Sequence, residues 1–247
     1  MTYRSIRAVI VVWALSLMVC SDDEAGFTYD VGYQRTDATT EAPVTVATEA
    51  GFDVTIARGY LHIGAVELVA CPHLSLEQIW QRLWSTPKAY AHGSTTAVRV
   101  SSPFIDNFTH ARDTEFDLGT FLPPQSSYCS IKVFFEAADE HADALPDDID
   151  MIGRTFYFEG TWKPQGGTTD TPFTWDSAIE HSVEIELDDP IAIDDDQSQR
   201  SGHLSLATDA LKWLDATQFD ALSDSAQASA LLNQIGTTVI PQVTAGH

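Results

Sequence analysis

The sequence predicts a mainly β protein, with a single β-sandwich-like domain and a few short helices. Short segments in which apolar and polar residues alternate recur along most of the chain. Few segments have helical spacing, and no internal repeat indicates a propeller or a solenoid. The chain is 44% hydrophobic, and the about 220 residues after the N-terminal segment are enough for one sizeable core.

The N-terminal segment, residues 1–20, has the pattern of an export signal. Arg4 and Arg7 form a positive region, and the apolar stretch 8–19 follows it. This stretch is shorter than the about 20 apolar residues that a membrane-spanning helix requires. The segment therefore predicts export from the cytoplasm.

Residues 17–20 resemble a bacterial lipoprotein box, which implies that Cys20 is lipidated and attaches the protein to a membrane. Val19 departs from that pattern, because a small residue usually precedes the cysteine. Ordinary cleavage after Ser21 is the alternative. Both readings place the protein in the periplasm or on the outer surface, and the first adds a lipid anchor.

Residues 21–50 are rich in Asp, Glu, Thr and Ala, and they predict an acidic tether between the anchor and the domain. Tyr29, Val31 and Tyr33 alternate with other residues and allow a short strand there, and residues 42–51 allow another. Firm alternation begins at Gly51, so the β-sandwich domain is predicted over residues 51–247.

The strands of this domain are recognised in order by their alternation. The 154–162 and 171–175 strands predict a hairpin, because a Gly-Gly turn signal joins them. The acidic segment 188–202 predicts a loop, and the last strand is expected directly after it. The predicted strands cover residues 52–71, 95–100, 115–122, 128–137, 154–162, 171–175, 178–187 and 203–208.

Three short helices complete the prediction. Residues 75–84 begin with Ser75 as the expected N-cap and carry apolar side chains at helical spacing. Two further helices are expected around residues 210–214 and 224–235. The last one has an apolar face, and Gly236 is expected to cap its C-terminus.

The net charge of the chain argues against binding to nucleic acids and to anionic membrane surfaces. It has 13 Lys and Arg against 36 Asp and Glu, a net charge of −23, which becomes −25 when the signal is removed with Arg4 and Arg7. Nucleic acids and anionic membrane surfaces repel such a protein, since both are bound through clustered Lys and Arg. We therefore expect no nucleic-acid partner and membrane attachment only through the lipid.

Lipidation of Cys20 would leave Cys71 and Cys129, an even number in an oxidising compartment. They predict a disulfide, which stabilises the fold by about 4 kcal/mol in the chain-entropy model. Two buried thiols and two metal ligands are the alternatives. The disulfide is favoured, because no CxxC pattern provides the start of a cysteine-rich zinc site.

Known catalytic motifs do not occur in the sequence. It contains no GxSxG, HExxH, GxxxxGK[ST] or GxGxxG pattern, and no carboxylate pair lies in an apolar setting that would raise one pKa. The acidic loop also lacks the calcium-binding pattern of an EF-hand. The sequence therefore predicts a protein that is not an enzyme.

The histidines are the side chains that indicate a possible metal site, since imidazole is a preferred ligand of zinc and copper. His62 lies on the strand face opposite Leu61 and Ile63, where surface exposure and ligation are both open, and the following glycine lets another group approach. His92 lies in a loop. His181 faces the core by alternation, where a hydrogen-bonded core histidine is favoured over a ligand. These three are the candidate metal ligands.

Several segments together resemble exported bacterial lipoproteins of unassigned activity: YLHIG, AYAH, PPQSSYCSIKV and LSLATDALKWLDATQFDAL. The last of them loosely resembles periplasmic copper-binding proteins associated with methanobactin uptake. This resemblance includes no ligand motif, so it implies no binding residues. It implies only that copper or another transition metal is a cargo to test.

Two functions from different classes follow. The first is a membrane-anchored exported lipoprotein that binds a small ligand, with copper or zinc as the candidate metal. The second is a structural module of the cell envelope that contacts another protein or a polysaccharide. Trp162 and Trp175 flank the Gly-Gly hairpin and are candidates for that contact surface, although core packing is favoured for at least one of them. Clustering of the histidines would favour the first function, and scattering the second.

Overall fold

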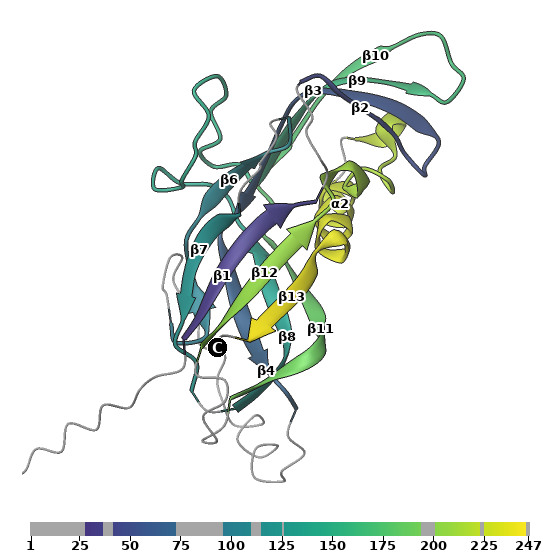
Figure 1. The fold of residues 1–247 in the computed structure, drawn as a ribbon. Coiled ribbons are helices and arrows are strands. Elements are labelled where there is room, and N and C mark those ends of the chain that lie inside the picture. The colour runs from purple at the N-terminus through teal and green to yellow at the C-terminus, as the bar shows by residue number, and fades with distance from the viewer. Residues whose placement is uncertain are drawn as a thin grey trace, which may run out of the picture.

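The computed structural model describes residues 28–36, 42–72, 96–109, 115–124, 126–193, 201–222 and 225–245. Within these ranges the chain is mainly β, which confirms the predicted class (Figure 1). No helix in the described part is long and apolar enough to cross a membrane. The predicted helix 75–84 lies outside the described residues, as do Cys20 and His92.

Within the described ranges, the elements up to Thr208 are strands, and the helices come after them. The strands are β1 (Thr28–Arg35), β2 (Val44–Ala47), β3 (Phe52–Ile63), β4 (Ala65–Ala70), β5 (Arg99–Val100), β6 (Phe104–Asn107), β7 (Phe116–Phe121), β8 (Ser126–Phe135), β9 (Phe156–Pro164), β10 (Thr171–Ser177), β11 (His181–Ile193), β12 (Ser201–Thr208) and β13 (Ile240–Ala245). The helices among the described residues are two 3-10 turns, η1 (Ala210–Lys212) and η2 (Phe219–Ala221), and the α-helix α2 (Ser225–Thr238).

These strands form three sheets. Sheet A has the order β13-β12-β1-β7, and its β1–β12 pair is parallel. Sheet B has the order β10-β9-β3-β2, with β6 also paired to β3. Sheet C has the order β11-β8-β4-β5. The predicted hairpin is confirmed as β9–β10.

Sheets A and C face each other across part of the core, and the main apolar cluster also includes residues of sheet B such as Val54, Ile56 and Phe158. Tyr33 and Leu206 of sheet A and Val133 and Phe135 of sheet C line one small apolar cavity. The chain passes from sheet B to sheet C at Gly64, between β3 and β4, so one strand run links both sheets. Figure 1 shows β2, β9 and β10 projecting beyond the other sheets at one end. The architecture is that of a β-sandwich-like domain.

The acidic tether predicted over residues 21–50 is wrong for residues 28–35 and 44–47, which form β1 and β2, and the short strands that the alternation allowed there are confirmed. The β1 strand is an interior strand of sheet A, flanked by β12 and β7, and Tyr29, Val31 and Tyr33 are almost fully buried. The alternation of these three residues therefore outweighs the acidic composition around them, because burying aromatic side chains stabilises a strand more than nearby carboxylates disfavour it.

The C-terminal part also departs from the prediction. The β11 strand continues to Ile193 into the segment predicted as an acidic loop, with a register shift between Glu186 and Ile191 that accommodates Pro190. The predicted last strand, β12, is followed by β13, which pairs with it after α2.

Gly236 lies inside α2 rather than capping it, since the helix extends to Thr238. A Cβ atom on Gly236 would lie 2.6 Å from the side chain of Val183 on β11. The glycine therefore lets the helix approach the sheet closely, and the predicted capping role is wrong.

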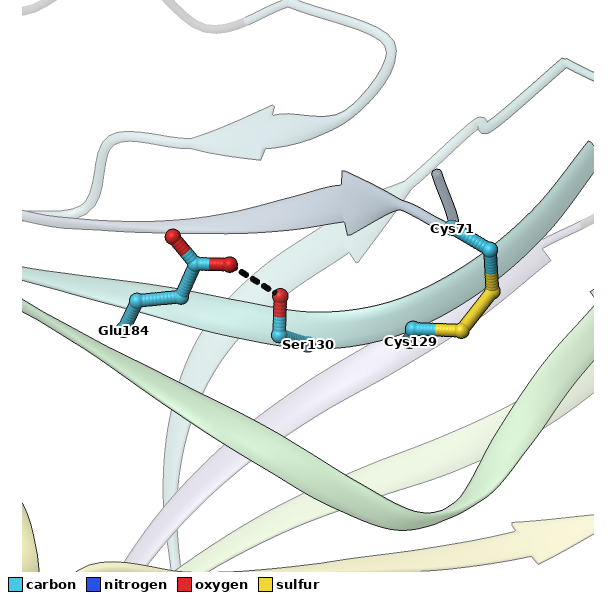
Figure 2. Close-up of a disulfide and its surroundings, with 4 residues drawn as sticks. All are labelled: Cys71, Cys129, Ser130 and Glu184. Atoms are coloured by element: carbon cyan, nitrogen blue, oxygen red, sulfur yellow. Dashed lines mark hydrogen bonds between the residues drawn. A yellow bond between two sulfur atoms is a disulfide. The ribbon is translucent and has the colours of Figure 1, made fainter. Parts of the chain in front are cut away.

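The predicted disulfide between Cys71 and Cys129 is confirmed (Figure 2). Ser130 pairs with Val69 and Tyr128 pairs with Ala70, so Cys129 is the extra residue of a β-bulge in β8. The bulge places Cys129 within a Cα–Cα distance of 4.8 Å from Cys71, just beyond the end of β4. A disulfide of this kind is typical of proteins outside the reducing cytosol.

Candidate functional site

Two of the three candidate histidines line adjoining cavities, which share Glu136 and Glu180 and which we together call the histidine groove. The inner cavity has a volume of about 260 Å³ and the outer one of about 570 Å³. The inner cavity is lined by His62, Gly64, Pro103, Glu136, Ala137, Asp139 and Glu180. The outer one is lined by Arg99, Phe134, Phe135, Glu136, Glu180, His181 and Ser182.

His62 lies near the end of β3 and is only 2% exposed, so the surface-exposed alternative is wrong. Both faces of β3 are covered there. Leu61 packs into the main core, while Tyr60, on the same strand face as His62, packs into a second apolar cluster that includes Met151 from the segment after β8. The alternation of residues within β3 could not reveal this second cluster, because its other members come from distant segments.

The ring of His62 is held in one orientation. Its Nδ1 lies 2.7 Å from the backbone carbonyl oxygen of Glu136. A carbonyl only accepts, so Nδ1–H donates and the neutral ring carries its lone pair on Nε2. Nε2 is buried and has no hydrogen-bond partner in the described part of the chain. Burial lowers the pKa of His62 below its ordinary 6.5, and the bond to Glu136 opposes this shift.

Gly64 brings a carboxylate close to this histidine. A Cβ atom at Gly64 would lie 2.6 Å from Oε2 of Glu136, so only glycine leaves room for that side chain. The expectation that this glycine admits another group is therefore confirmed, and the group is the carboxylate of Glu136. Its acceptor oxygens lie at the boundary between the two cavities.

Arg99 fixes the other side of Glu136 and was not anticipated from the sequence. One guanidinium nitrogen lies 3.1 Å from Oε1 of Glu136 and another 3.8 Å from Oε2 of Glu67. The guanidinium also stacks 4.0 Å from the ring centroid of Phe134. A lone arginine in an alternating apolar segment was the available signal, because a buried arginine needs a partner.

His181 stands at the opening of the groove and not in the core, so its predicted core position is wrong. It shares the inward face of β11 with the partly buried Val183 and Ile185, but it is the first residue of the strand and lies at the margin of the sandwich. Its Nε2 lies 2.9 Å from Oδ1 of Asn233 on α2. Tertiary packing against the helix, rather than the core, determines its environment.

The donors of the groove are not assembled into a metal site. Among the described residues, no group of three or more His, Cys, Asp and Glu side chains is placed to hold a metal ion. His141 is exposed and contacts Asp139, and the partly exposed His203 contacts Glu115. The groove thus supplies imidazole and carboxylate donors beside a cationic guanidinium, which suits a small polar ligand or a cation that draws the donors together.

The two hairpin tryptophans do not form a shared surface. Trp175 is 5% exposed and packs edge-to-face on Phe156 in the core. Trp162 is partly buried against Phe52. Core packing, the role favoured from the sequence for at least one of these two residues, is therefore confirmed for Trp175.

Comparison with known proteins gives little further constraint. No protein-family model matches the chain, and no curated protein matches it. The solved structure of MbnP from Methylosinus trichosporium aligns over 90% of this chain and 98% of its own, at 12% sequence identity and a TM-score of 0.29. At that TM-score the alignment carries no argument about ligand or activity, and the C-terminal resemblance stays a resemblance.

Proposed function

We propose that this protein is exported, is anchored by lipid at Cys20, and binds a small ligand in the histidine groove, with copper or zinc as the candidate metal. The observation that supports this binding site is the environment of His62. Its Nδ1–H is fixed on the carbonyl of Glu136, its Nε2 lone pair is buried without a partner in the described part of the chain, and its ring lines the inner cavity.

This arrangement of His62 is favourable for a ligand histidine. Histidines that bind metals usually donate their second ring N–H to a carbonyl or a carboxylate, which fixes the tautomer and the ring orientation. Imidazole and carboxylate oxygen are donors that suit zinc and copper(II). His62, the carboxylate of Glu136 and His181 would hold the metal, and His92 stays a candidate ligand from the sequence alone.

Binding would require rearrangement, since these donors are not already placed around one point. The carboxylate of Glu136 is paired with Arg99, so a bound cation would compete with the guanidinium for it. Metal affinity should therefore depend on how readily this ion pair opens. The same groove, with its carboxylates and its guanidinium, also suits a small zwitterionic ligand.

The test is a calorimetric titration of copper(II) and zinc into the full chain and into a variant with His62, His92 and His181 all changed to alanine. A variant with His203 changed to alanine is the matched control, because this histidine is partly exposed and its partner Glu115 does not line the histidine groove. We expect the triple variant to lose affinity by at least about tenfold and the control to keep it. Unchanged affinity in a folded triple variant would contradict the assignment.

Lipid attachment is tested separately. Mass spectrometry of the protein from its native envelope should show an N-terminal Cys20 carrying acyl chains, and a Cys20→Ala variant should be released from the membrane fraction. An N-terminus after Ser21 would contradict the anchor and favour ordinary cleavage.

The second candidate function is an interaction module of the cell envelope. It is supported by an edge of β10 with which no other described strand pairs, beside a groove lined by other residues than the histidine groove. A protein that takes up no metal on titration would direct attention to this function.

A further inference from the structure

A second groove runs between the edge of sheet B and helix α2. β10 is the terminal strand of that sheet among the described residues, with β9 on one side. The groove has a volume of about 370 Å³. Thr174, Trp175, Asp176 and Ser177 of β10 line one wall, and Leu222, Ser225 and Ala228 line the other. We call it the β10–α2 groove.

The groove follows the backbone edge of β10 rather than one face of the sheet. Successive side chains of a strand point to opposite faces, so a cavity over one face would be lined by alternate residues. Here four consecutive residues, 174–177, line it. The main chain of β10 is therefore part of the wall.

Pro172 identifies which backbone groups point away from β9. It pairs with Thr161 in regular register, and a proline inside a strand has to place its nitrogen on the unpaired edge because it has no N–H to donate. With a period of two, the N–H and C=O groups of Thr174 and Asp176 lie on that same edge. They face the β10–α2 groove.

The opposite wall is suited to side chains of a bound segment. Leu222 and Ala228 are apolar, and Ser225 begins α2. The groove carries the carboxylate of Asp176, which lies 3.4 Å from the guanidinium of Arg154, and no Lys or Arg lines the groove itself. The whole chain has a net charge of −23, so its field attracts a positively charged segment and repels an acidic one.

We propose that the β10–α2 groove binds an extended, Lys- or Arg-containing segment of a partner protein, which adds to sheet B as a strand beside β10. Main-chain hydrogen bonds to the edge of β10 give the affinity in this mode, and pockets for alternate side chains give the selectivity. The wall of α2 sets the width available to the segment. Pairing of β10 with a second copy of this chain is disfavoured, since both copies carry the same large negative charge.

The probe is a capped synthetic peptide of about six alternating Val and Lys residues, the length of a typical strand. Its binding to the full chain is followed by fluorescence anisotropy. A second peptide of equal charge carries N-methyl groups at alternate backbone positions, which removes its hydrogen-bond donors on one edge. We expect the first peptide to bind at least about tenfold more tightly than the methylated one. Equal binding would overturn strand addition and indicate charge attraction alone.

A pair of variants tests the edge on the protein side. Thr174→Pro removes an outward N–H and, like Pro172, leaves the ladder to β9 intact, whereas Thr174→Val keeps the N–H. We expect Thr174→Pro to weaken peptide binding at least about tenfold and Thr174→Val to keep it. Equal binding by both variants would overturn the proposal. If Thr174→Pro fails to fold, the comparison of the two peptides on the unmodified protein tests the proposal instead. A dimer by light scattering that Thr174→Pro abolishes would assign the edge to self-pairing instead.

Discussion

The Nδ1 atom of His62 lies 2.7 Å from the backbone carbonyl oxygen of Glu136, across a separation of 74 residues in the chain. The bond joins β3 to the segment that follows β8. It fixes the tautomer of a histidine that is almost completely buried. It also ties the ring to the same residue whose carboxylate pairs with Arg99, so the position of the ring and the charge beside it depend on one residue.

Protonation of His62 should destabilise the fold as pH falls. Burial lowers its pKa in the folded protein below the 6.5 of an exposed histidine, so below about pH 6.5 the unfolded chain binds the proton more readily. The free energy of unfolding should therefore fall between about pH 6.5 and the lowered pKa. Urea unfolding of the protein and of His62→Gln across this range measures the difference, and parallel pH curves for both would contradict the buried neutral histidine.

Removal of the disulfide should lower the free energy of unfolding by about 4 kcal/mol, because the Cys71–Cys129 link closes a loop with a sequence separation of 58 and restricts the unfolded chain. The Cys71→Ala/Cys129→Ala variant and the reduced protein should unfold at the same urea concentration. Added reductant should leave the double variant unchanged, and a shift there would show that reduction acts elsewhere.

Gly236→Ala should destabilise the protein, although alanine is intrinsically the better helix former by about 1 kcal/mol. The new methyl group would lie 2.6 Å from the side-chain atoms of Val183, and overpacking of this kind costs about 1–3 kcal/mol. Thermal unfolding measures the loss. Val183→Ala in the same background should recover part of it, and no recovery would show that the contact is not the cause.

Salt should raise the melting temperature. The chain carries 36 acidic and 13 basic residues, and their net repulsion is screened when the Debye length falls from about 14 Å at 0.05 M to about 3 Å at 1 M salt. Scanning calorimetry in increasing NaCl should show a steady rise. Sucrose at matched osmolality is the control, and an equal rise in both would point to solvent exclusion in place of charge screening.

Much of the fold follows from local patterns. The alternating segments become strands, the Gly-Gly signal joins β9 to β10, and the apolar face predicted for the last helix is buried. What the local pattern leaves open is pairing. β1 lies beside β12 in a parallel pair that matches Thr28 with Ser201, and no local feature of either strand specifies that neighbour.

The candidate site likewise combines features that follow from local patterns with features that depend on tertiary packing. Histidine content and the glycine after Ile63 indicated that His62 has a close neighbour, and Glu136 is that neighbour. The sequence did not reveal that both faces of β3 are covered at His62, nor that Arg99 pairs with Glu136. Both features depend on the segment after β8, which folds back over β3. The position of His181 at the margin depends likewise on where α2 packs.

The sequence by itself determined the mainly β class, the acidic surface and the cysteine pair, since these depend on alternation, composition and count. Only the tertiary structure decided that residues 28–35 belong to the interior of a sheet, that two histidines share one groove and that no other described strand pairs with the outer edge of β10. The physical reason is that a strand's own sequence encodes which face is apolar, whereas its neighbours are selected by the summed burial and hydrogen bonding of segments far apart in the chain.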